Sequence, residues 1–369
     1  MSQARTQTSL IMPFMRMASG HQHVANTLMN ELEKCPGHID CHKIDILSYS
    51  YGNLEKLIVA TYLAWIKFLP SMYHRLYVQM SYQKSNQRHI LYETLFHTYF
   101  KKLLADKKPN ILFFTHSLPS NIASQLKEKQ MLESTTVNVY TDFFVNSVWG
   151  KAGIDYHFVP SLTVKDYLIE QGVPADRIYL TGIPVDRIFT NHDRVHRNTN
   201  QRSLLVSGGN LGIGAVEKIL TAAKDSKTFH YYILCGKNKV LYNRLKGMNL
   251  SSITPLPYIH SKTRMNELYN EVDGVITKPG GVTVSECLMK KKPIFMIDPL
   301  PGQERINEYQ LKRLGLAIPL DNKETNLEKQ LLHFFQNESI QKRYESRVYR
   351  YHQHLDKRPL QLIIEEILN

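Results

Sequence analysis

The segment of the sequence best suited to hold a ligand is residues 276–288, which read ITKPGGVTVSECL. Its first residues have a strand pattern, Gly280 and Gly281 permit a tight turn, and a helix pattern follows. Thr283 lies near the start of that helix, where its hydroxyl and the free backbone N–H groups can hold a diphosphate. Glu286 lies one turn further on, where a carboxylate can accept hydrogen bonds from both hydroxyls of a ribose. The alternative interpretation is a structural turn in which Glu286 is a capping-box residue.

Polar side chains suited to sugar recognition come after the next predicted strand. A proline and a glycine there are followed by Gln303, Glu304 and Asn307. Amide and carboxylate groups of this kind form hydrogen bonds with hydroxyl groups. Because the ligand of an open parallel sheet lies outside the carboxyl ends of its strands, these residues are predicted to share one site with residues 278–286.

Two further glycine-containing turns follow predicted strands. Residues 204–214, LLVSGGNLGIG, are typical of a phosphate-binding loop made of backbone N–H groups, with Ser207 and Gly208 at its start. The loop lacks the Gly-Lys-Ser/Thr ending of a Walker A loop and the acidic partner of a dinucleotide fingerprint. The other turn contains Gly20 and His21, which open the first predicted helix. His21 could orient or protonate a substrate oxygen, or could be a helix cap or a surface residue.

Strand and helix patterns alternate along the chain with short connections, which indicates an α/β protein with parallel, doubly wound sheets. The strands predicted in the first half are residues 9–15, 39–47, 110–115, 136–141 and 157–160. The helices predicted between them are residues 20–33, 119–129 and 162–171. The second half repeats the alternation with strands at residues 203–207, 229–235, 274–277, 293–297 and 315–318, and helices at residues 214–224 and 263–270.

A polar stretch at residues 191–202 separates the two halves and is predicted to be a linker. We therefore expect two Rossmann-like domains that face each other across a cleft, at residues 1–190 and 191–330. A C-terminal helical region is predicted at residues 331–369.

The composition narrows the classes of protein and partner. The 369 residues are 43% hydrophobic and 21% charged, which excludes disordered, collagen-like and coiled-coil chains. The formal net charge of +13 favours an anionic partner, such as nucleic acid, a phosphorylated ligand or an acidic membrane surface. The basic residues are dispersed and no nucleic-acid-binding motif accompanies them, so nucleic acid is not expected as a partner.

The cysteines and the apolar runs predict neither a metal site nor a membrane span. Four cysteines are too few for a disulfide framework, and Cys35, Cys41 and His42 lack the spacing of a zinc site. No stretch reaches the roughly 18 apolar residues of a membrane span, and the N-terminus lacks the apolar run of a signal peptide. We expect a protein that is cytoplasmic or peripheral on a membrane.

Residues 54–88 interrupt the alternation with a segment that is dense in aromatic, aliphatic and basic side chains, among them Trp65 and Phe68. Long aromatic side chains beside basic ones suit the headgroup zone of an anionic bilayer. The alternative is a helix that packs on its own domain, and periodicity does not separate the two.

Together these motifs resemble glycosyltransferase family 28, in the branch of monogalactosyldiacylglycerol synthases and processive diacylglycerol glucosyltransferases. The resemblance lies in KPGGVTVSE at residues 278–286, PGQERINE at residues 301–308 and Gly-His at residues 20–21. It extends over nearly the whole chain and includes the Thr-Asp and Trp of residues 141–149 and TGIPV at residues 181–185. It implies a GT-B fold and a UDP-sugar donor that is a co-substrate rather than a cofactor. It also implies inversion at the anomeric carbon without a bound metal.

The resemblance also implies roles for individual residues. The implied donor contacts are Gly280, Gly281, Thr283, Ser207 and Gly208 for the diphosphate, Glu286 for the ribose, Gln303, Glu304 and Asn307 for the hexose, and Tyr258 beside uracil. The implied catalytic residues are Asp142, as the base for the acceptor hydroxyl, and His21, as an alternative base or a positioning group. An aspartate of ordinary pKa, about 4, needs burial to act as a base at neutral pH.

The function implied is transfer of a hexose, with glucose favoured, from a UDP-sugar to diacylglycerol or a related lipid on the inner face of the cell membrane. One departure from the family pattern is Asn146, which stands where a histidine is common between the Thr-Asp pair and the tryptophan. Two other functions stay open: a UDP-sugar 2-epimerase, and a non-catalytic protein that binds a UDP-sugar or a lipid.

Overall fold

The chain forms two compact units in the computed structural model: Met1–Val185 with His354–Asn369, and Asp186–Gln353. The structure describes residues 7–14, 19–36, 39–52, 60–61, 68–69, 71–72, 75, 78–79, 90–190, 201–208, 215–224, 226–321 and 326–368. The predicted linker therefore lies largely outside the described residues, and so does most of the segment at residues 54–88. The boundary between the units falls a few residues before the predicted one.

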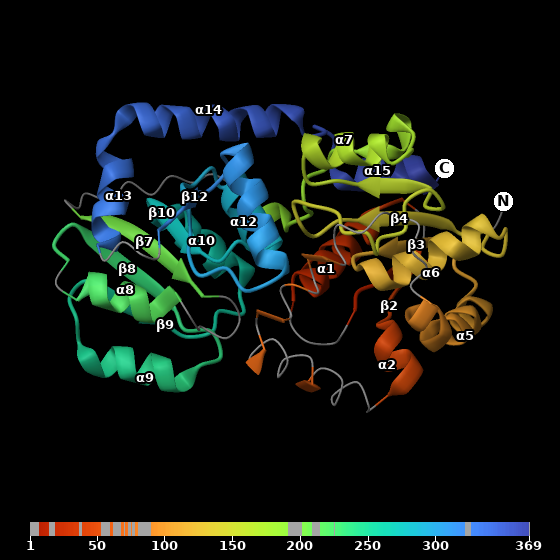
Figure 1. Ribbon diagram of the computed structural model, residues 1–369, viewed down its shortest axis with the longest axis horizontal. Helices are drawn as coiled ribbons and strands as arrows, with labels where there is room; N and C mark the ends of the chain where they lie inside the picture. Colours follow the sequence, from red (N-terminus) through yellow and green to blue (C-terminus); the bar gives the residue numbers. More distant parts are fainter. Residues whose placement is uncertain are drawn as a thin grey trace. The chain divides into compact units, whose positions relative to one another are not determined.

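The first unit contains a six-stranded parallel sheet in the order β2-β1-β3-β4-β5-β6. Strands β2, β3 and β4 of this sheet are labelled in Figure 1. Its strands are β1 Gln7–Met12, β2 Ile39–Lys43, β3 Ile111–Phe114, β4 Thr135–Val139, β5 Tyr156–Phe158 and β6 Ile178–Tyr179. All four residues of β3 are completely buried, as expected of a central strand covered on both faces. The predicted parallel sheet is confirmed, and β6 is a short strand that the sequence pattern did not indicate.

Helices connect these strands and cover the sheet. They are α1 Gly20–Leu32, α2 Ile46–Tyr51, α5 Ile90–Lys107, α6 Ser117–Glu128, α7 Leu162–Glu170, the short 3-10 helix η1 Ala175–Arg177, and α15 Leu360–Leu368. The strand predicted for residues 39–47 ends early, because Asp45 begins α2. Its carboxylate accepts hydrogen bonds from Leu47 N (3.1 Å) and Ser48 Oγ (2.7 Å), which caps a helix where the pattern predicted strand.

The second unit has its own six-stranded parallel sheet, in the order β12-β11-β10-β7-β8-β9. Its strands are β7 Arg202–Ser207, β8 Phe229–Leu234, β9 Ile253–Leu256, β10 Gly274–Thr277, β11 Ile294–Met296 and β12 Ile318–Pro319. Its helices are the 3-10 helix η2 Arg187–Thr190 and α8 Ala215–Ala223, α9 Lys239–Met248, α10 Lys262–Glu271, α11 Gly281–Met289, α12 Gln303–Leu314, α13 Leu327–Gln336 and α14 Glu338–His354. The two predicted Rossmann-like sheets are both present, whereas β9, α9 and α12 were missed.

The predicted C-terminal helical region is divided between the two units. Helices α13 and α14 belong almost entirely to the second unit, and α15 returns to the first, where it contacts α1. Ile363, Ile364 and Ile367 on one face of α15 are buried, and Gln361 Nε2 donates to Lys34 O (2.8 Å). An apolar face on a terminal helix therefore completes the core of the unit in which the chain began.

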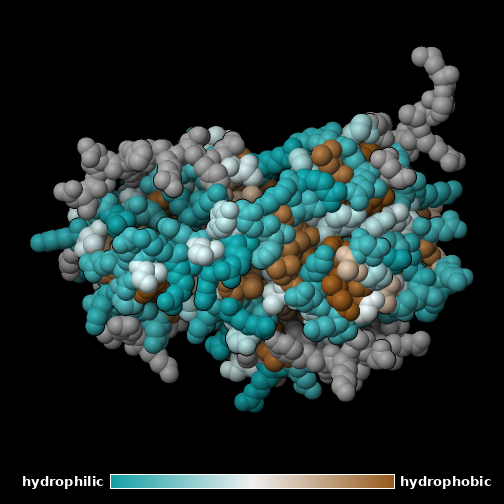
Figure 2. Space-filling model, turned by 90° about the horizontal axis from the view of Figure 1, so that it is seen from above, coloured by the Kyte–Doolittle hydropathy of each residue, from teal (hydrophilic) through white to brown (hydrophobic). Residues whose placement is uncertain are grey.

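On the face shown in Figure 2, the described surface is largely hydrophilic and includes several apolar patches. Among the described residues, no helix has both the length and the apolar composition to cross a bilayer. In the segment at residues 54–88, three described side chains are strongly exposed: Phe68 (71%), Leu69 (52%) and Met72 (46%). Such exposure does not fit a helix packed on its own domain at these three positions.

Candidate functional site

Three strand ends lie next to one another at one edge of the second sheet. In the strand register, Thr277 at the end of β10 is paired with Ser207 at the end of β7 and with Met296 at the end of β11. The segments that leave these three strands must therefore begin side by side. They include Ser207 and Gly208, the turn before α11, and the turn before α12. The sequence prediction that these motifs share one edge is confirmed.

The turn between β10 and α11 exposes backbone. Gly280 N donates to Lys278 O (2.8 Å), which closes the turn, and Gly280 is the N-cap of α11 with no side-chain capping bond. A side chain at Gly280 would meet no atom within 4 Å, and its φ of −80° suits any residue. Neither packing nor conformation requires a glycine here, and the absence of a side chain leaves the backbone open to approach. The first-turn N–H groups and the helix dipole favour an anion at this point.

Glu286 lies on α11 beyond this turn, half-buried, and accepts a hydrogen bond from the hydroxyl of Tyr269 (Oη to Oε2, 2.9 Å). Burial raises the pKa of Glu286 to about 7. The hydrogen bond from Tyr269 and the charge of Lys262 lower this pKa, whereas the charge of Asp186 raises it. Glu286 is therefore a carboxyl group whose ionisation changes near neutral pH. Thr283, one turn before Glu286, is also half-buried.

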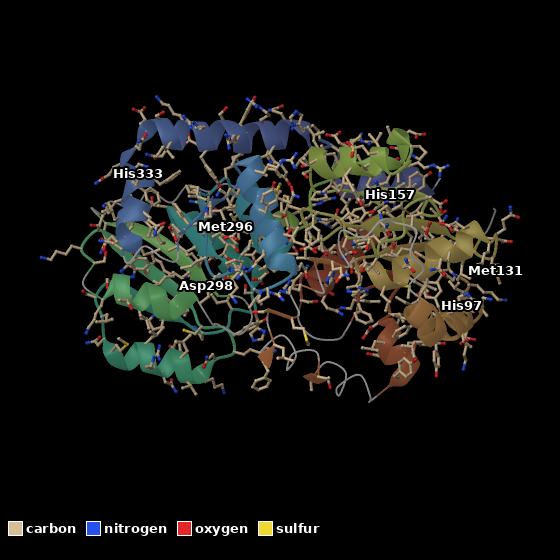
Figure 3. The ribbon with its side chains drawn as sticks, in the orientation of Figure 1. His97, Met131, His157, Met296, Asp298 and His333 are labelled. Carbon is tan, nitrogen blue, oxygen red and sulfur yellow. The ribbon has the colours of Figure 1, made fainter. Side chains whose placement is uncertain are left out.

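The turn between β11 and α12 has an unusual backbone. Asp298 lies shortly after Met296, and both are labelled in Figure 3. Asp298 has a φ of +48°, and Gly302 has a φ of +85°. Asp tolerates the left-handed region better than most residues, but such positions concentrate at functional sites. Glu304 stabilises the turn, because its Oε2 accepts a hydrogen bond from Leu300 N (2.7 Å). One oxygen of the predicted sugar-binding carboxylate is thus used within the protein.

The other predicted donor contacts differ in accessibility. Gln303 is half-buried at the start of α12, where a ligand could reach it, whereas Asn307 is completely buried on the inner face of that helix. Asn307 therefore presents no surface to a hexose, so a role in supporting α12 suits it better. Tyr258 follows edge strand β9, and its ring contacts His260 (centroids 4.5 Å apart) and Lys237 Nζ (5.7 Å). Strand β9 does not pair with β10, so the strand register does not place Tyr258 beside residues 278–286.

In the first unit, the ends of β1, β3 and β4 bring His21 next to two threonines. His21 Nδ1 is 2.5 Å from the carbonyl oxygen of Thr115 and 3.1 Å from Oγ1 of Thr141. The Thr115 hydroxyl donates in turn to His21 O (3.1 Å). Because a carbonyl oxygen only accepts, Nδ1 carries the imidazole proton, and a neutral His21 keeps a lone pair on Nε2.

Burial lowers the pKa of His21, while the charge of Asp142 and the carbonyl of Thr115 act in the opposite direction. The lowered pKa keeps the imidazole neutral at pH 7. Asp142 itself is half-buried and directly follows Thr141. The structure thus brings the two predicted catalytic residues into electrostatic contact and leaves His21 in the form that accepts a proton at Nε2.

A second histidine, which sequence reasoning missed, adjoins His21. His116 is the N-cap of α6, with Nδ1 accepting from Leu118 N (3.2 Å), so its neutral form carries the proton on Nε2. Its ring stacks on Phe14 (centroids 4.5 Å apart) and meets the His21 ring edge-on (4.9 Å). Burial, followed by the charge of His21, holds the pKa of His116 well below its ordinary value. The only sequence signal was a histidine directly after a strand.

Hydrogen bonds to Asn138 and Ser120 fix the loop that carries Asp142. Asn138 Nδ2 donates to Gly150 O (2.8 Å), Ser120 Oγ donates to Asn138 Oδ1 (2.7 Å), and Gly150 N donates to Ser120 Oγ (3.2 Å). A Cβ on Gly150 would lie 2.6 Å from Ser120 O, so only glycine fits there. Asn146 shapes the same loop, because its Oδ1 accepts from Val148 N (3.0 Å).

The comparisons with known proteins agree across both units. Residues 21–185 match the family model for monogalactosyldiacylglycerol (MGDG) synthase, and residues 203–356 match the C-terminal domain of glycosyltransferase family 28. An uncharacterized glycosyltransferase of Bacillus subtilis, YkoN, is 39% identical over 97% of this chain and 96% of its own. The chain belongs to glycosyltransferase family 28.

Other members of this family are more distant. A processive diacylglycerol beta-glucosyltransferase of Bacillus cereus is 27% identical to this family 28 protein, over 81% of this chain and 79% of its own. Together with the family models, these relatives make the protein a transferase.

Solved structures support the same fold. The glycosyltransferase of kitacinnamycin has a TM-score of 0.65 at 10% identity, over 99% of this chain and all of the other. The neighbours of this kind make the fold of this family 28 glycosyltransferase GT-B. A UDP-N-acetylglucosamine 2-epimerase from Neisseria meningitidis, bound to that sugar nucleotide, also matches, with a TM-score of 0.56 at 14% identity over 98% of this chain and 99% of its own. The fold alone therefore does not separate transferases from epimerases, whereas the sequence relationship to glycosyltransferases does.

No group of three or more His, Cys, Asp or Glu side chains among the described residues could hold a metal ion. All four cysteines are free thiols, three of them buried.

Proposed function

We propose that this family 28 glycosyltransferase moves a hexose, glucose in the first instance, from a UDP-sugar to diacylglycerol in a membrane, with inversion at the anomeric carbon. The observation that carries the proposal is the open N-terminus of α11 at Gly280, with the carboxyl group of Glu286 on the same helix. Backbone N–H groups there suit a diphosphate, and a carboxylate suits the two hydroxyls of a pentose.

The donor is proposed to bind to the second unit. Gly280, Gly281 and Thr283 would hold the diphosphate with help from Ser207 and Gly208, which begin beside them at the end of β7. Glu286 would hold the ribose. The hexose hydroxyls would be met by the side chains of Gln303 and Glu304, at the start of α12. Tyr258 would lie beside uracil. It follows β9, an edge strand that β7 and β8 separate from β10.

The proton transfer is proposed to belong to the first unit. Nε2 of His21 takes the proton from the acceptor hydroxyl as that oxygen attacks the anomeric carbon from the face opposite UDP. The bond from the anomeric carbon to the diphosphate oxygen breaks, and the N-terminus of α11 stabilises the charge on the leaving UDP. Asp142 stabilises the imidazolium that forms, since its charge already acts on His21. This arrangement exchanges the primary roles that the sequence implied for the two residues, and it assigns no step to a metal.

The lipid acceptor and the membrane location have separate support. Relatives named processive diacylglycerol beta-glucosyltransferase match four-fifths of the chain. Phe68, Leu69 and Met72 present apolar surface to solvent, and Arg75 is exposed close to them in the sequence. Apolar side chains near a cation suit an anionic lipid surface, which we place at the inner face of the cell membrane.

One assay tests the proposal directly. Purified protein is incubated with a panel of UDP-sugars and liposomes that contain diacylglycerol and anionic lipid, and the products are separated by mass spectrometry. We expect a glucosylated diacylglycerol to form from UDP-glucose, and no such product with liposomes that lack diacylglycerol. Isomerisation of a UDP-sugar without lipid would instead indicate an epimerase. Binding of a UDP-sugar without its consumption would indicate a non-catalytic binding protein, the alternative that Asn146 leaves open.

A further inference from the structure

Glu286 is held by a tyrosine that neither the sequence motif nor the proposed mechanism includes. Tyr269 lies on α10, is 1% exposed, and donates its hydroxyl to Glu286 Oε2 at 2.9 Å. Its ring meets the ring of Phe189, from η2, edge-on, with centroids 5.7 Å apart. The ring is thus fixed by packing while the hydroxyl reaches the carboxylate.

Other ionisable groups of the described residues act on Glu286 or lie on the elements around it. Lys262, on α10, forms an ion pair with Asp186, which precedes η2 (2.7 Å). Cys287 is the neighbour of Glu286 on α11 and is completely buried. Arg187, at the start of η2, is exposed, and the strands β10 and β11 beneath α11 carry no ionisable residue. Among these groups of the described chain, the hydrogen bond to Glu286 comes from Tyr269.

A carboxylate that binds a ligand gains affinity when its orientation is fixed in advance, because no rotational freedom is then lost on binding. A hydrogen bond from a hydroxyl to the charged form of a carboxyl group also favours that form. Only the ionised carboxyl can accept hydrogen bonds with both of its oxygens.

We propose that Tyr269 is a positioning residue for Glu286, which it orients and keeps ionised, so that affinity for a uridine nucleotide depends on pH near neutrality through this hydroxyl. The inference rests on the proposed function, since it takes Glu286 as the contact to the pentose.

The sign of the effect follows from the surroundings. Burial raises the pKa of Glu286 to about 7, and the hydrogen bond from Tyr269 lowers it. Loss of the hydroxyl therefore moves the pKa of Glu286 upward. If the carboxylate is the binding form, nucleotide affinity is present above this pKa and declines as the pH falls through it, so loss of the hydroxyl moves the decline to higher pH.

The test is the affinity of wild type and Tyr269→Phe for UDP-glucose, measured by calorimetry from about pH 6 to about pH 9. UDP-glucose is the probe because its diphosphate has no proton to lose in this range, unlike UDP. In the wild type, affinity should rise with pH and then level off. In Tyr269→Phe the midpoint should lie higher by roughly half a unit to one unit, which weakens binding several-fold at neutral pH and little at the alkaline end.

The matched control is Tyr231→Phe. Tyr231 is a completely buried tyrosine on β8 of the same unit, and its hydroxyl has no hydrogen-bond partner in the part of the chain that the structure describes. This variant loses the same atom and should keep the wild-type pH profile. Lys262→Met is a second variant for the case that Tyr269→Phe fails to fold. It removes an exposed charge that lowers the pKa of Glu286, so the midpoint should again move upward.

The outcomes separate the two proposals. A wild-type affinity that does not vary with pH, or an equal loss at every pH in Tyr269→Phe, would overturn the role of Tyr269 and leave nucleotide binding intact. A wild type that binds no UDP-glucose at any pH would instead overturn the proposed function.

Discussion

In the first unit, burial lowers the pKa of His21, whereas in the second unit burial raises the pKa of Glu286 to about 7. Both shifts favour the neutral form of the side chain. A neutral imidazole is a proton acceptor, so burial prepares His21 for its proposed task. A neutral carboxyl group loses acceptor capacity, so burial works against Glu286 unless a donor such as Tyr269 opposes it. The same physical effect thus demands different support in the two units.

The support also comes from different parts of the chain. His21 is hydrogen-bonded to Thr115, which is 94 residues away in the sequence, whereas Glu286 is hydrogen-bonded to Tyr269, which is 17 residues away. If the units divide the work as proposed, substitutions in the first change the rate of transfer and substitutions in the second change donor affinity. The predictions below test that division, from the largest expected effect to the smallest.

The largest effect is expected for His21→Ala. Removal of a general base typically lowers kcat by on the order of 10²- to 10⁴-fold, and the donor site in the other unit should be unaffected. Steady-state transfer rates and calorimetry with UDP-glucose measure the two quantities separately. His354→Ala, an exposed histidine at the end of α14, is the control and should retain activity. A loss of donor affinity as large as the loss of rate would show that the units do not divide the work.

Glu286→Ala should have the reverse signature. Hydrogen bonds to a charged group are worth about 1.5–3 kcal/mol each, so the loss of two at the lower end of this range should lower donor affinity on the order of 100-fold. At saturating donor, kcat should stay near that of the wild type. Glu345→Ala, at an exposed position on α14 of the same unit, is the control. Unchanged affinity for UDP-glucose would remove Glu286 from the pentose site.

The candidate sites of the two units also differ in how far the sequence predicts them. The donor motifs are local in sequence, because a glycine turn between a strand and a helix sets its own backbone conformation. The adjacent parallel strands β7, β10 and β11 then bring the motifs together. The support for His21 depends instead on which strands become neighbours, which a single sequence does not specify. Asn307 has the residue type of a sugar contact, but its helix turns it inward. Tyr269 fits an ordinary apolar helix position, so its hydroxyl gave no signal.

Asp142→Asn sharpens the comparison within the first unit. The charge of Asp142 raises the pKa of His21, so its loss lowers that pKa. The neutral imidazole then persists to lower pH, so the acidic limb of the plot of kcat/KM against pH should shift to lower pH. The plateau should fall about tenfold, because the imidazolium that forms loses roughly 1.4 kcal/mol of stabilisation. UDP-glucose affinity should not change.

Other outcomes of this variant have distinct meanings. Complete loss of transfer at every pH would make Asp142 itself the base. Full turnover with an unmoved profile would place Asp142 outside the mechanism.

The smallest effect is expected for Gly280→Ala, which tests whether a ligand phosphate approaches the backbone of the second unit. A Cβ at Gly280 meets no protein atom within 4 Å, and the φ of −80° is allowed for alanine. Only the poorer N-cap preference of alanine then applies, so the free energy of unfolding should fall by no more than about 1 kcal/mol. If a phosphate lies against this backbone, the new methyl group displaces it. Loss of one hydrogen bond of about 1 kcal/mol weakens UDP binding roughly fivefold. Uridine, which has no phosphate, should bind as it does to the wild type.

Gly247→Ala is the matched control, because the space around Gly247 on α9 is equally open, and it should leave both affinities unchanged. Equal weakening of UDP and uridine would mean that the methyl group disturbs the helix rather than a phosphate contact, and the N-terminus of α11 would lose its proposed role.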